Sequence, residues 1–389
     1  MTLRPAALQL ALLLVALLPF SARAADKDPL QDLCVGLSAD ELQQLQLPFN
    51  INGLPCKPAA AVNSSDFASH QLRNPGIFTG SLDSAVNLAT AATFGGLNTQ
   101  GLSVARIDYN PRGINPPHVH PRSTEVLFLA QGKLLPSSRL RRSSAYTTTS
   151  PASIMTLWRA ALELALLLVA LLLFSTRAAD EDPLQDLCVG LSADELQQLQ
   201  LPFNINGLPC KPAAAVNSSD FASHQLHNPG IFGIFAGSLG SAVNLATAAT
   251  FGGLNTQGLS VARIDYNPRG INPPHVHPRT TEVLFLAQDK ILVGFVTTAP
   301  DNKLFCQTIY AGDLFVFPRG LVHFQLNPDK NKPARAIAAL NSQNPGAFQL
   351  AVALFNSDPP LPEEVLETTL GIGDYELRRL IASVKKTLV

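Results

Sequence analysis

Short apolar runs separated by clusters of Pro, Gly, Asn and Asp dominate the second half of the chain. They recur about every ten residues, a pattern that is typical of an all-β sandwich or barrel. After residue 362 the apolar spacing becomes helical, at 363–368 and 374–387. The pattern therefore predicts a small β-barrel with a C-terminal helical extension. The expected strands cover residues 259–266, 281–288, 291–298, 303–310, 313–317, 322–326, 336–340 and 348–355.

The first half of the chain is a second version of the same sequence. Residues 1–133 recur as residues 155–290 with about eleven substitutions and one three-residue insertion near residues 233–235. The second version continues to the end of the chain, whereas the first diverges after Lys133, before the strands that would close a barrel. We therefore expect a truncated copy over residues 25–133 and a complete copy over residues 179–389.

Each copy begins with an apolar segment that is typical of a secretory signal. In residues 1–24 the apolar run ends at Ala22-Arg-Ala24, whose small residues suit cleavage. The run is shorter than the ~20 residues of a membrane-spanning helix, so its length favours secretion over anchoring. Residues 155–178 repeat this segment inside the chain. They are either a second cleavage site after Ala178 or a poor anchor weakened by Glu163.

Residues 134–154, between the copies, are basic, rich in Ser and Thr, and without apolar periodicity. This composition predicts a disordered linker. A tandem domain does not normally carry a second signal in its middle. We interpret the sequence as a fusion of two adjacent gene copies, in which the linker derives from the sequence between them.

Sequencing of the transcript tests the fusion. Two separate messages, one for each copy, are the expected result. One message that spans both copies would contradict the interpretation.

Charge and glycosylation sequons narrow the class of protein. The net charge is -1, and no Lys/Arg-rich face is present. Nucleic acid is therefore not an expected partner, because phosphate binding needs clustered positive charge. In a secreted chain, Asn63-Ser-Ser and Asn217-Ser-Ser are candidate glycosylation sites.

Five cysteines fit an oxidising compartment. Cys34 and Cys56 flank one short loop, and Cys188 and Cys210 flank its duplicate, so two local disulfides are the natural pairing. Cys306 is left over within an apolar run, where we expect a buried free thiol rather than a reactive one.

Three histidines and one glutamate in the second copy have the spacing of a metal site. His275 and His277 lie two residues apart in an extended stretch, so both point to the same face of a strand. Glu282 would point to the opposite face under strict alternation, so the chain must bend at Pro278-Arg279. His323 begins a further strand, and in a closed barrel these strands can converge on one interior point.

The ligand types restrict the metal without choosing it. A His-x-His pair alone is more often a pair of surface histidines, but Glu282 and His323 favour a metal site. No thiolate is nearby, which excludes a structural zinc site of the Cys type. Imidazole and carboxylate ligands suit manganese, iron, zinc or copper.

The truncated copy repeats the first half of this set as His118, His120 and Glu125, but no fourth ligand follows. A three-ligand site is chemically possible. An unclosed barrel, however, leaves an exposed sheet edge. We therefore expect residues 25–133 to bind no metal tightly.

The whole second copy resembles a plant germin-like protein of the cupin superfamily. The resemblance is carried by residues 270–282, 312–327, 341–346 and 182–188. It implies a cupin jelly-roll β-barrel, secretion to the apoplast, and a homo-oligomer, a hexamer of paired subunits whose C-terminal helices clasp a neighbour. It also implies a disulfide between Cys188 and Cys210. The implied cofactor is Mn²⁺, held by His275, His277, Glu282 and His323.

Departures from the family pattern bear on the reaction. The family usually has Gly where this chain has Arg269 and Asp289, and Asp tolerates turn conformations. Oxalate-oxidising germins have an Asn where this chain has Ala262, which cannot hydrogen-bond oxalate. The other amide of the substrate pocket, Asn272, is retained. The resemblance therefore disfavours oxalate oxidase.

Two functions from different classes follow from the resemblance. Among enzymes, a manganese-dependent superoxide dismutase with a role in defence fits best, since a small substrate such as superoxide needs no Asn to hold it. The alternative is a cell-wall, storage-type or receptor-like glycoprotein in which the metal is structural. Fold and ligand spacing alone do not choose between them.

Overall fold

The computed structural model of the chain describes residues 33–37, 54–78, 82–120, 123–134, 188–191, 194, 208–230 and 239–388. One compact unit comprises Pro29–Thr124 and Gln185–Val389, and the other comprises Met1–Asp28 and Glu125–Leu184. In the latter only residues 125–134 are described, and they contain no helix or strand. The expected signal at 1–24 and its repeat at 155–178 lie outside the described residues, as does the linker at 134–154 except for Leu134.

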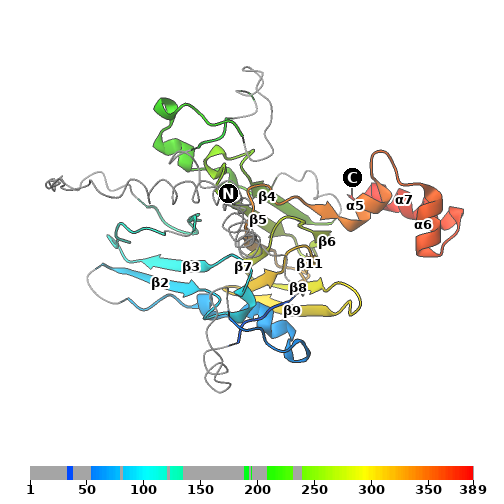
Figure 1. The fold of residues 1–389 in the computed structure, drawn as a ribbon, viewed down its shortest axis with the longest axis horizontal. Coiled ribbons are helices and arrows are strands. Elements are labelled where there is room, and N and C mark those ends of the chain that lie inside the picture. Colours follow the sequence, from blue (N-terminus) through cyan, green and yellow to red (C-terminus); the bar gives the residue numbers. More distant parts are fainter. Residues whose placement is uncertain are drawn as a thin grey trace, which may run out of the picture. The chain divides into compact units, whose positions relative to one another are not determined.

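Two antiparallel sheets form the barrel in the larger unit (Figure 1). One sheet has the strand order β1-β10-β7-β12-β5-β4, and the other has the order β13-β6-β11-β8-β9. A separate two-stranded sheet, β2-β3, belongs to the first copy. The strands are β1 (Ala68–Ser69), β2 (Ser84–Ala89), β3 (Val104–Tyr109), β4 (Ser241–Ala246), β5 (Ser260–Tyr266), β6 (Ile271–Val276), β7 (Glu282–Gln288), β8 (Lys290–Val296), β9 (Leu304–Tyr310), β10 (Leu314–Phe317), β11 (Val322–Leu326), β12 (Ala334–Leu340) and β13 (Phe348–Gln349).

Helices are short except at the C-terminus. The α-helices whose full length lies in the described ranges are α5 (Leu350–Phe355), α6 (Glu363–Leu370) and α7 (Asp374–Leu388). None of the helices in the described ranges is long and apolar enough to cross a membrane. The 3-10 helices are η2 (Ala59–Ala61), η3 (Ser64–Phe67), η4 (Gln71–Arg73), η5 (Gly95–Leu97), η6 (Ala213–Ala215), η7 (Ser218–Phe221), η8 (Gln225–His227) and η9 (Gly252–Leu254).

The strand pattern confirms the expected all-β barrel, with one correction. The apolar run at 348–355 is a two-residue strand, β13, followed by the helix α5, and not a single strand. Leu350–Phe355 is apolar at every position, and such a run has no periodicity that distinguishes a strand from a buried helix. The helical C-terminal extension therefore begins before Pro362.

Strand β10 shows where the core lies. Its alternate residues face opposite sides of the sheet. Phe315 and Phe317 belong to the barrel core, which also contains Tyr266, Leu284 and Phe295. The neighbouring pair, Leu314 and Val316, packs instead against Leu72, Phe94 and Leu97 of the first copy. All four residues of β10 are consequently buried.

The first copy thus adds a strand and a core side chain to the second copy's barrel. Its strand β1 pairs with β10, so that Ala68 lies opposite Phe315. Phe67 inserts into the core, with its ring centroid 4.8 Å from that of Phe295 and 5.3 Å from that of Phe305. Residues separated by more than two hundred positions therefore share one core.

Disulfides join Cys34 to Cys56 and Cys188 to Cys210. Both local pairings agree with the sequence-based expectation. Cys306 in β9 is free, but it is half-buried rather than fully buried. Burial raises the pKa of its thiol, so the protonated and unreactive form is favoured.

Two residues that replace family glycines have left-handed backbone conformations. Arg269 has a φ of 65° and Asp289 a φ of 62°. Glycine adopts this region without the Cβ clash that other residues meet, and Asp tolerates it better than most. A glycine at either turn would therefore be less strained than the residue present.

Phe67 and its repeat Phe221 provide a matched test of the shared core. Phe67 is 2% exposed and Phe221 is 47% exposed, although the surrounding sequence is the same. We expect Phe67→Ala to destabilise the barrel by about 3 kcal/mol, the cost of a large cavity in a core. Phe221→Ala should cost less than about 1 kcal/mol. Denaturant unfolding measures both, and equal losses would refute the shared core.

Candidate metal centre

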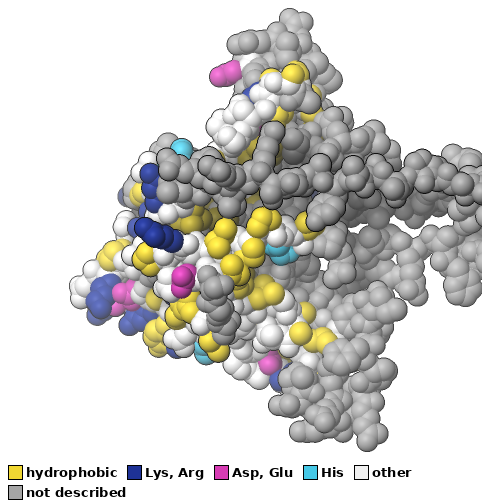
Figure 2. All heavy atoms as spheres, turned by 90° about the vertical axis from the view of Figure 1, so that its left-hand side faces the viewer, with side chains coloured by type: hydrophobic (Ala, Val, Ile, Leu, Met, Phe, Trp, Pro, Cys, Tyr) yellow, Lys and Arg dark blue, Asp and Glu magenta, His cyan; other side chains and the backbone are white. Residues whose placement is uncertain are grey.

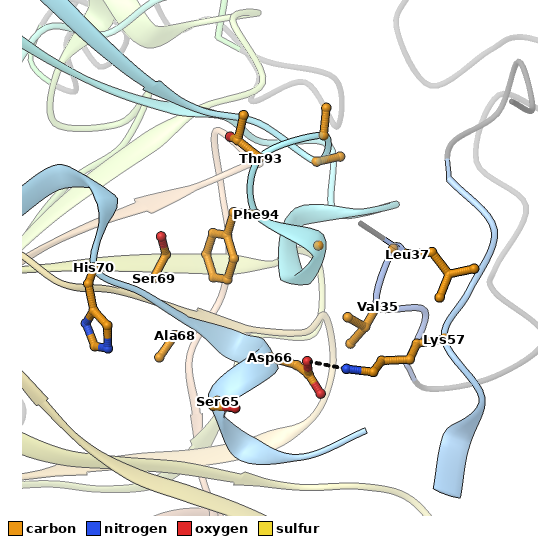
Figure 3. Close-up of a pocket in the computed structure, with 14 residues that line it drawn as sticks. Val35, Leu37, Lys57, Ser65, Asp66, Ala68, Ser69, His70, Thr93 and Phe94 are labelled. Atoms are coloured by element: carbon orange, nitrogen blue, oxygen red, sulfur yellow. Dashed lines mark hydrogen bonds and ion pairs between the residues drawn. The ribbon is translucent and has the colours of Figure 1, made fainter. Parts of the chain in front are cut away.

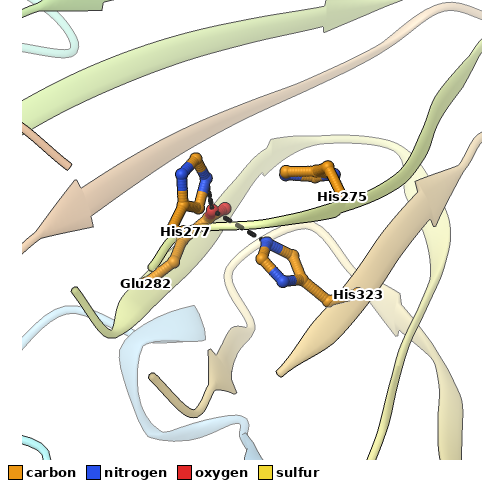
Figure 4. Close-up of side chains that lie close together, drawn as sticks. All are labelled: His275, His277, Glu282 and His323. Carbon is orange, nitrogen blue, oxygen red and sulfur yellow. Dashed lines mark ion pairs between the residues drawn. The ribbon is translucent and has the colours of Figure 1, made fainter. Parts of the chain in front are cut away.

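Four side chains of the second copy meet inside the barrel (Figure 4). His275 lies in β6, and His277 follows that strand directly. Glu282 is the first residue of β7 in the other sheet, after a turn at residues 278–279. His323 lies in β11, where it is paired with His275. Three imidazoles from one sheet therefore face one carboxylate from the other.

A β-bulge sets the register of these side chains. His323 pairs with His275 and Gln325 pairs with Asn272, with a register shift between the two pairs. Strand β6 thus uses three residues where β11 uses two, and the bulge brings Asn272 to the same face as His275. Pro273-Pro274 occupies the bulge, where proline's missing N–H costs least.

Backbone carbonyls fix the orientation of all three rings. The Nδ1 atom of His275 lies 2.8 Å from the carbonyl oxygen of Pro273, and Nδ1 of His323 lies 2.8 Å from that of Leu321. Nδ1 of His277 contacts the carbonyl oxygen of Gly346. A carbonyl only accepts hydrogen bonds, so each Nδ1 carries the proton. Each neutral ring then presents the lone pair of Nε2 as a metal ligand.

The ligand atoms converge at short range. Nε2 of His277 lies 3.1 Å from Oε2 of Glu282, and Nε2 of His323 lies 3.5 Å from the same oxygen. One potential ligand atom from each of the four residues lies within 4.8 Å of the others. The ring centroids of His275 and His323 are 4.1 Å apart. This is the convergence that a single ion needs.

Burial and charge favour the metal-binding forms of His275 and Glu282, whereas contact with Glu282 outweighs burial and raises the pKa of His277. Burial, together with the nearby imidazole of His323, lowers the pKa of His275 to about 3. Burial by itself would raise the pKa of Glu282, but the adjacent imidazoles of His277 and His323 hold it well below its usual range. His275 is therefore neutral and Glu282 ionised over the physiological range, and these are the forms that bind metal.

Two buried atoms of the cluster lack partners. Oε1 of Glu282 and Nε2 of His323 have no hydrogen bond, although both residues are almost wholly buried. Buried polar atoms are normally satisfied, and those that are not need an explanation such as an ion. The donor set and these unpaired atoms fit a metal ion bound among His275, His277, Glu282 and His323.

The substrate-pocket candidate has a partner that the sequence reasoning missed. Nδ2 of Asn272 donates to Oε1 of Gln325 at 2.6 Å, and both side chains are buried. Nε2 of Gln325 itself has no hydrogen-bond partner. Gln325 lies two residues beyond His323, so strand alternation could have placed it on the same face. Ala262, also buried, lies in β5.

The candidate residues of the truncated copy have a different environment. His118 and His120 are exposed in the larger unit, and Glu125, also exposed, belongs to the other unit. Buried convergence of His and Glu side chains, within the described ranges, occurs only in the second copy.

The two candidate glycosylation sites, Asn63 and Asn217, are both exposed. Each of them caps a short 3-10 helix.

A cavity of about 340 Å³ lies in the first copy, and its lining does not include the four clustered side chains (Figure 3). Its lining includes the ion pair between Lys57 and Asp66, 3.0 Å apart, and the ring of Phe94. The chemistry of the buried cluster is therefore separate from this cavity.

Comparison with known proteins gives the family of the chain. The profile of the cupin family matches residues 70–137 and 234–377. Germin-like protein subfamily 2 member 4 of Arabidopsis thaliana is 47% identical over 203 residues, covering 52% of this chain and 87% of the relative. Germin-like protein 1-3 of Oryza sativa subsp. japonica is 50% identical over 189 residues, covering 49% and 80%. A solved oxalate oxidase is 37% identical, with a TM-score of 0.48, covering 53% of this chain and 98% of that chain.

These matches define a cupin jelly-roll protein. The chain belongs to the germin-like proteins of the cupin family. The chain contains two copies of this sequence, and the cupin profile matches part of each.

Metal stoichiometry tests the assignment of the four residues. We expect one tightly bound ion per full-length chain, measured by elemental analysis after dialysis. His323→Ala should weaken binding more than about 100-fold, since it removes a ligand rather than a supporting group. The matched control, His118→Ala in the truncated copy, should leave binding unchanged. Two ions per chain, or an equal loss in the control, would contradict the assignment.

Proposed function

We propose that the chain is a secreted, manganese-binding germin-like protein of the plant apoplast, with superoxide dismutase activity and a role in defence. The observation that carries the proposal is the buried set of three Nε2 atoms and one carboxylate, with every Nδ1 held by a carbonyl. Manganese when bound supplies one-electron redox chemistry. Four protein ligands leave room for a small ligand on an octahedral ion.

The chain's own residues have three roles in this proposal. His275, His277 and His323 bind the ion through Nε2, and Glu282 adds negative charge that favours a cation. The surrounding barrel excludes bulk water from the cluster. Gln325, on the same strand face as His323, offers an unpaired N–H donor that can orient a small anion.

Oxalate is a poor fit to the same pocket. The methyl group of Ala262 offers no hydrogen bond. The amide Nδ2 of Asn272 already donates to Oε1 of Gln325 at 2.6 Å. Nδ2 of Asn272 keeps one further N–H, so the pocket offers oxalate one amide where the resemblance implies two. We therefore propose that the chain is not an oxalate oxidase.

A non-enzymatic role is the second candidate. The cluster joins the two sheets, since Glu282 comes from one and the three histidines from the other. A bound ion would therefore cross-link the barrel, as a structural metal does. In that case the protein is a cell-wall, storage-type or receptor-like glycoprotein, and the metal contributes stability without turnover.

Location and assembly complete the proposal. Two disulfides agree with an oxidising compartment, and exposed Asn63 and Asn217 are accessible to glycosylation. By family resemblance we propose a hexamer. Helices α5 to α7, at one side of the barrel in Figure 1, would supply contacts between subunits.

An enzymatic role and a structural role of the metal predict different results when the metal is removed. We expect the manganese-loaded chain to dismutate superoxide well above the rate of the same concentration of free Mn²⁺, and to show no oxalate oxidation. Chelation should abolish this activity, and manganese should restore it. Activity that survives complete metal loss would eliminate the mechanism. A loaded chain no faster than free Mn²⁺, but with a higher melting temperature than the metal-free chain, would favour the structural role.

A further inference from the structure

Two stretches of identical sequence lie in different surroundings. Residues 34–72 and 188–226 match at every position. In the first, Phe67 is 2% exposed between Phe295 and Phe305, whereas Phe221 in the second is 47% exposed. Local sequence is the same in both, so the difference comes from what each stretch contacts.

Each copy holds its own version of the stretch in the same way. Nη1 of Arg106 donates to the carbonyls of Leu72 and Arg73, at 3.1 Å and 2.7 Å. Nη1 of Arg263 donates to the matching carbonyls of Leu226 and His227. The second copy therefore presents the same segment, but only the first copy's segment lies on a barrel edge.

The edge strand β10 accepts one such segment. Ala68 and Ser69 pair with Phe315 and Leu314 along this strand. The outer face of β10 is covered by Leu72 and other apolar residues of the first copy. With the first copy in place, both the hydrogen-bonding edge and the outer apolar face of β10 are occupied.

A buried carboxylate distinguishes the two segments. Asp313, whose side chain is 0% exposed, accepts from Nε and Nη2 of Arg73 at 2.5 Å and 2.8 Å. Nδ1 of His70 lies 2.6 Å from the same carboxylate. The second copy has His227 where the first has Arg73, and an imidazole cannot form this two-pronged contact. The first position at which the two copies differ after the identical stretch, Arg73 or His227, is thus the position that contacts Asp313.

We propose that the truncated first copy is an intramolecular partner of the complete barrel. By occupying the β10 edge, it keeps out the matching segment, residues 216–227, of another copy of this chain. Arg73 gives the first copy its advantage through Asp313. The exposed segment around Phe221 would compete for the same edge of β10. It has His227 where the first copy has Arg73, so its contact with Asp313 would be weaker.

The docked copy also contacts the chain next to a proposed metal ligand. Oε1 of Gln100 accepts from the hydroxyl of Thr281 at 2.8 Å, and its carbonyl accepts from Nδ2 of Asn341 at 3.0 Å. Thr281 directly precedes Glu282. The first copy therefore contacts the residue before β7 as well as strand β10. Figure 2 shows exposed hydrophobic side chains, in yellow, on the face that lies at the left in Figure 1.

Hydrogen exchange on the full-length chain tests the proposal with an internal control. The two stretches have the same sequence through Leu72 and Leu226, so their unfolded exchange rates match. Peptides ending at Arg73 and at His227 differ in mass and can be followed separately. We expect residues 68–72 to exchange at least about tenfold more slowly than residues 222–226, independently of protein concentration. Equal exchange, or protection lost on dilution, would overturn intramolecular docking.

Two single variants test the role of Arg73. Arg73→His gives the first copy the second copy's residue, and it should reduce the protection of residues 68–72 by about tenfold or more. His227→Arg, the matched control, should leave that protection unchanged at low protein concentration. The second copy already carries His at this position, which shows that the segment tolerates it. Unchanged protection in Arg73→His would overturn the selective role of Arg73.

Discussion

The buried carboxylate of Glu282 is the constraint on which the barrel interior depends. A lone carboxylate in an apolar core costs several kcal/mol, so the surrounding structure must supply compensating groups. Nε2 of His277 and Nε2 of His323 face this carboxylate at 3.1 Å and 3.5 Å, and they compensate its charge either as protonated imidazoles or through a cation bound between them. Because Glu282 belongs to one sheet and the histidines to the other, the two sheets must keep a fixed separation and register. The packing of the two sheets therefore sets the geometry of the site, and a change in either would disturb the other.

The same register explains features that are far from the cluster. The bulge at Pro273-Pro274 brings Asn272 into line with His275, and the carbonyl of Pro273 then holds the ring of that histidine. On the opposite sheet, β10 buries all four of its residues because the first copy covers its outer face. The truncated copy, which has no closed barrel of its own in the described residues, contributes its apolar surface to the barrel that is complete.

Much of this arrangement was predictable from the sequence. Alternation and turn residues located most strands, and the spacing of the histidines and Glu282 located the four clustered side chains. The helix α5 was not predictable, because its six apolar residues have no period. Gln325 was missed because a single glutamine carries no signal without the bulge that pairs it with Asn272. The docking of Phe67 was also beyond the sequence, since Phe221 has the same neighbours in the chain and a different environment.

The central claim is that the second copy alone binds manganese, through Nε2 of three histidines and the carboxylate of Glu282. Anomalous diffraction from a crystal of the manganese-loaded chain, recorded at the manganese absorption edge, tests it most directly. The account predicts one strong peak among His275, His277, Glu282 and His323, on the Nε2 side of each ring. A peak at His118 and His120, or none within the barrel, would contradict it.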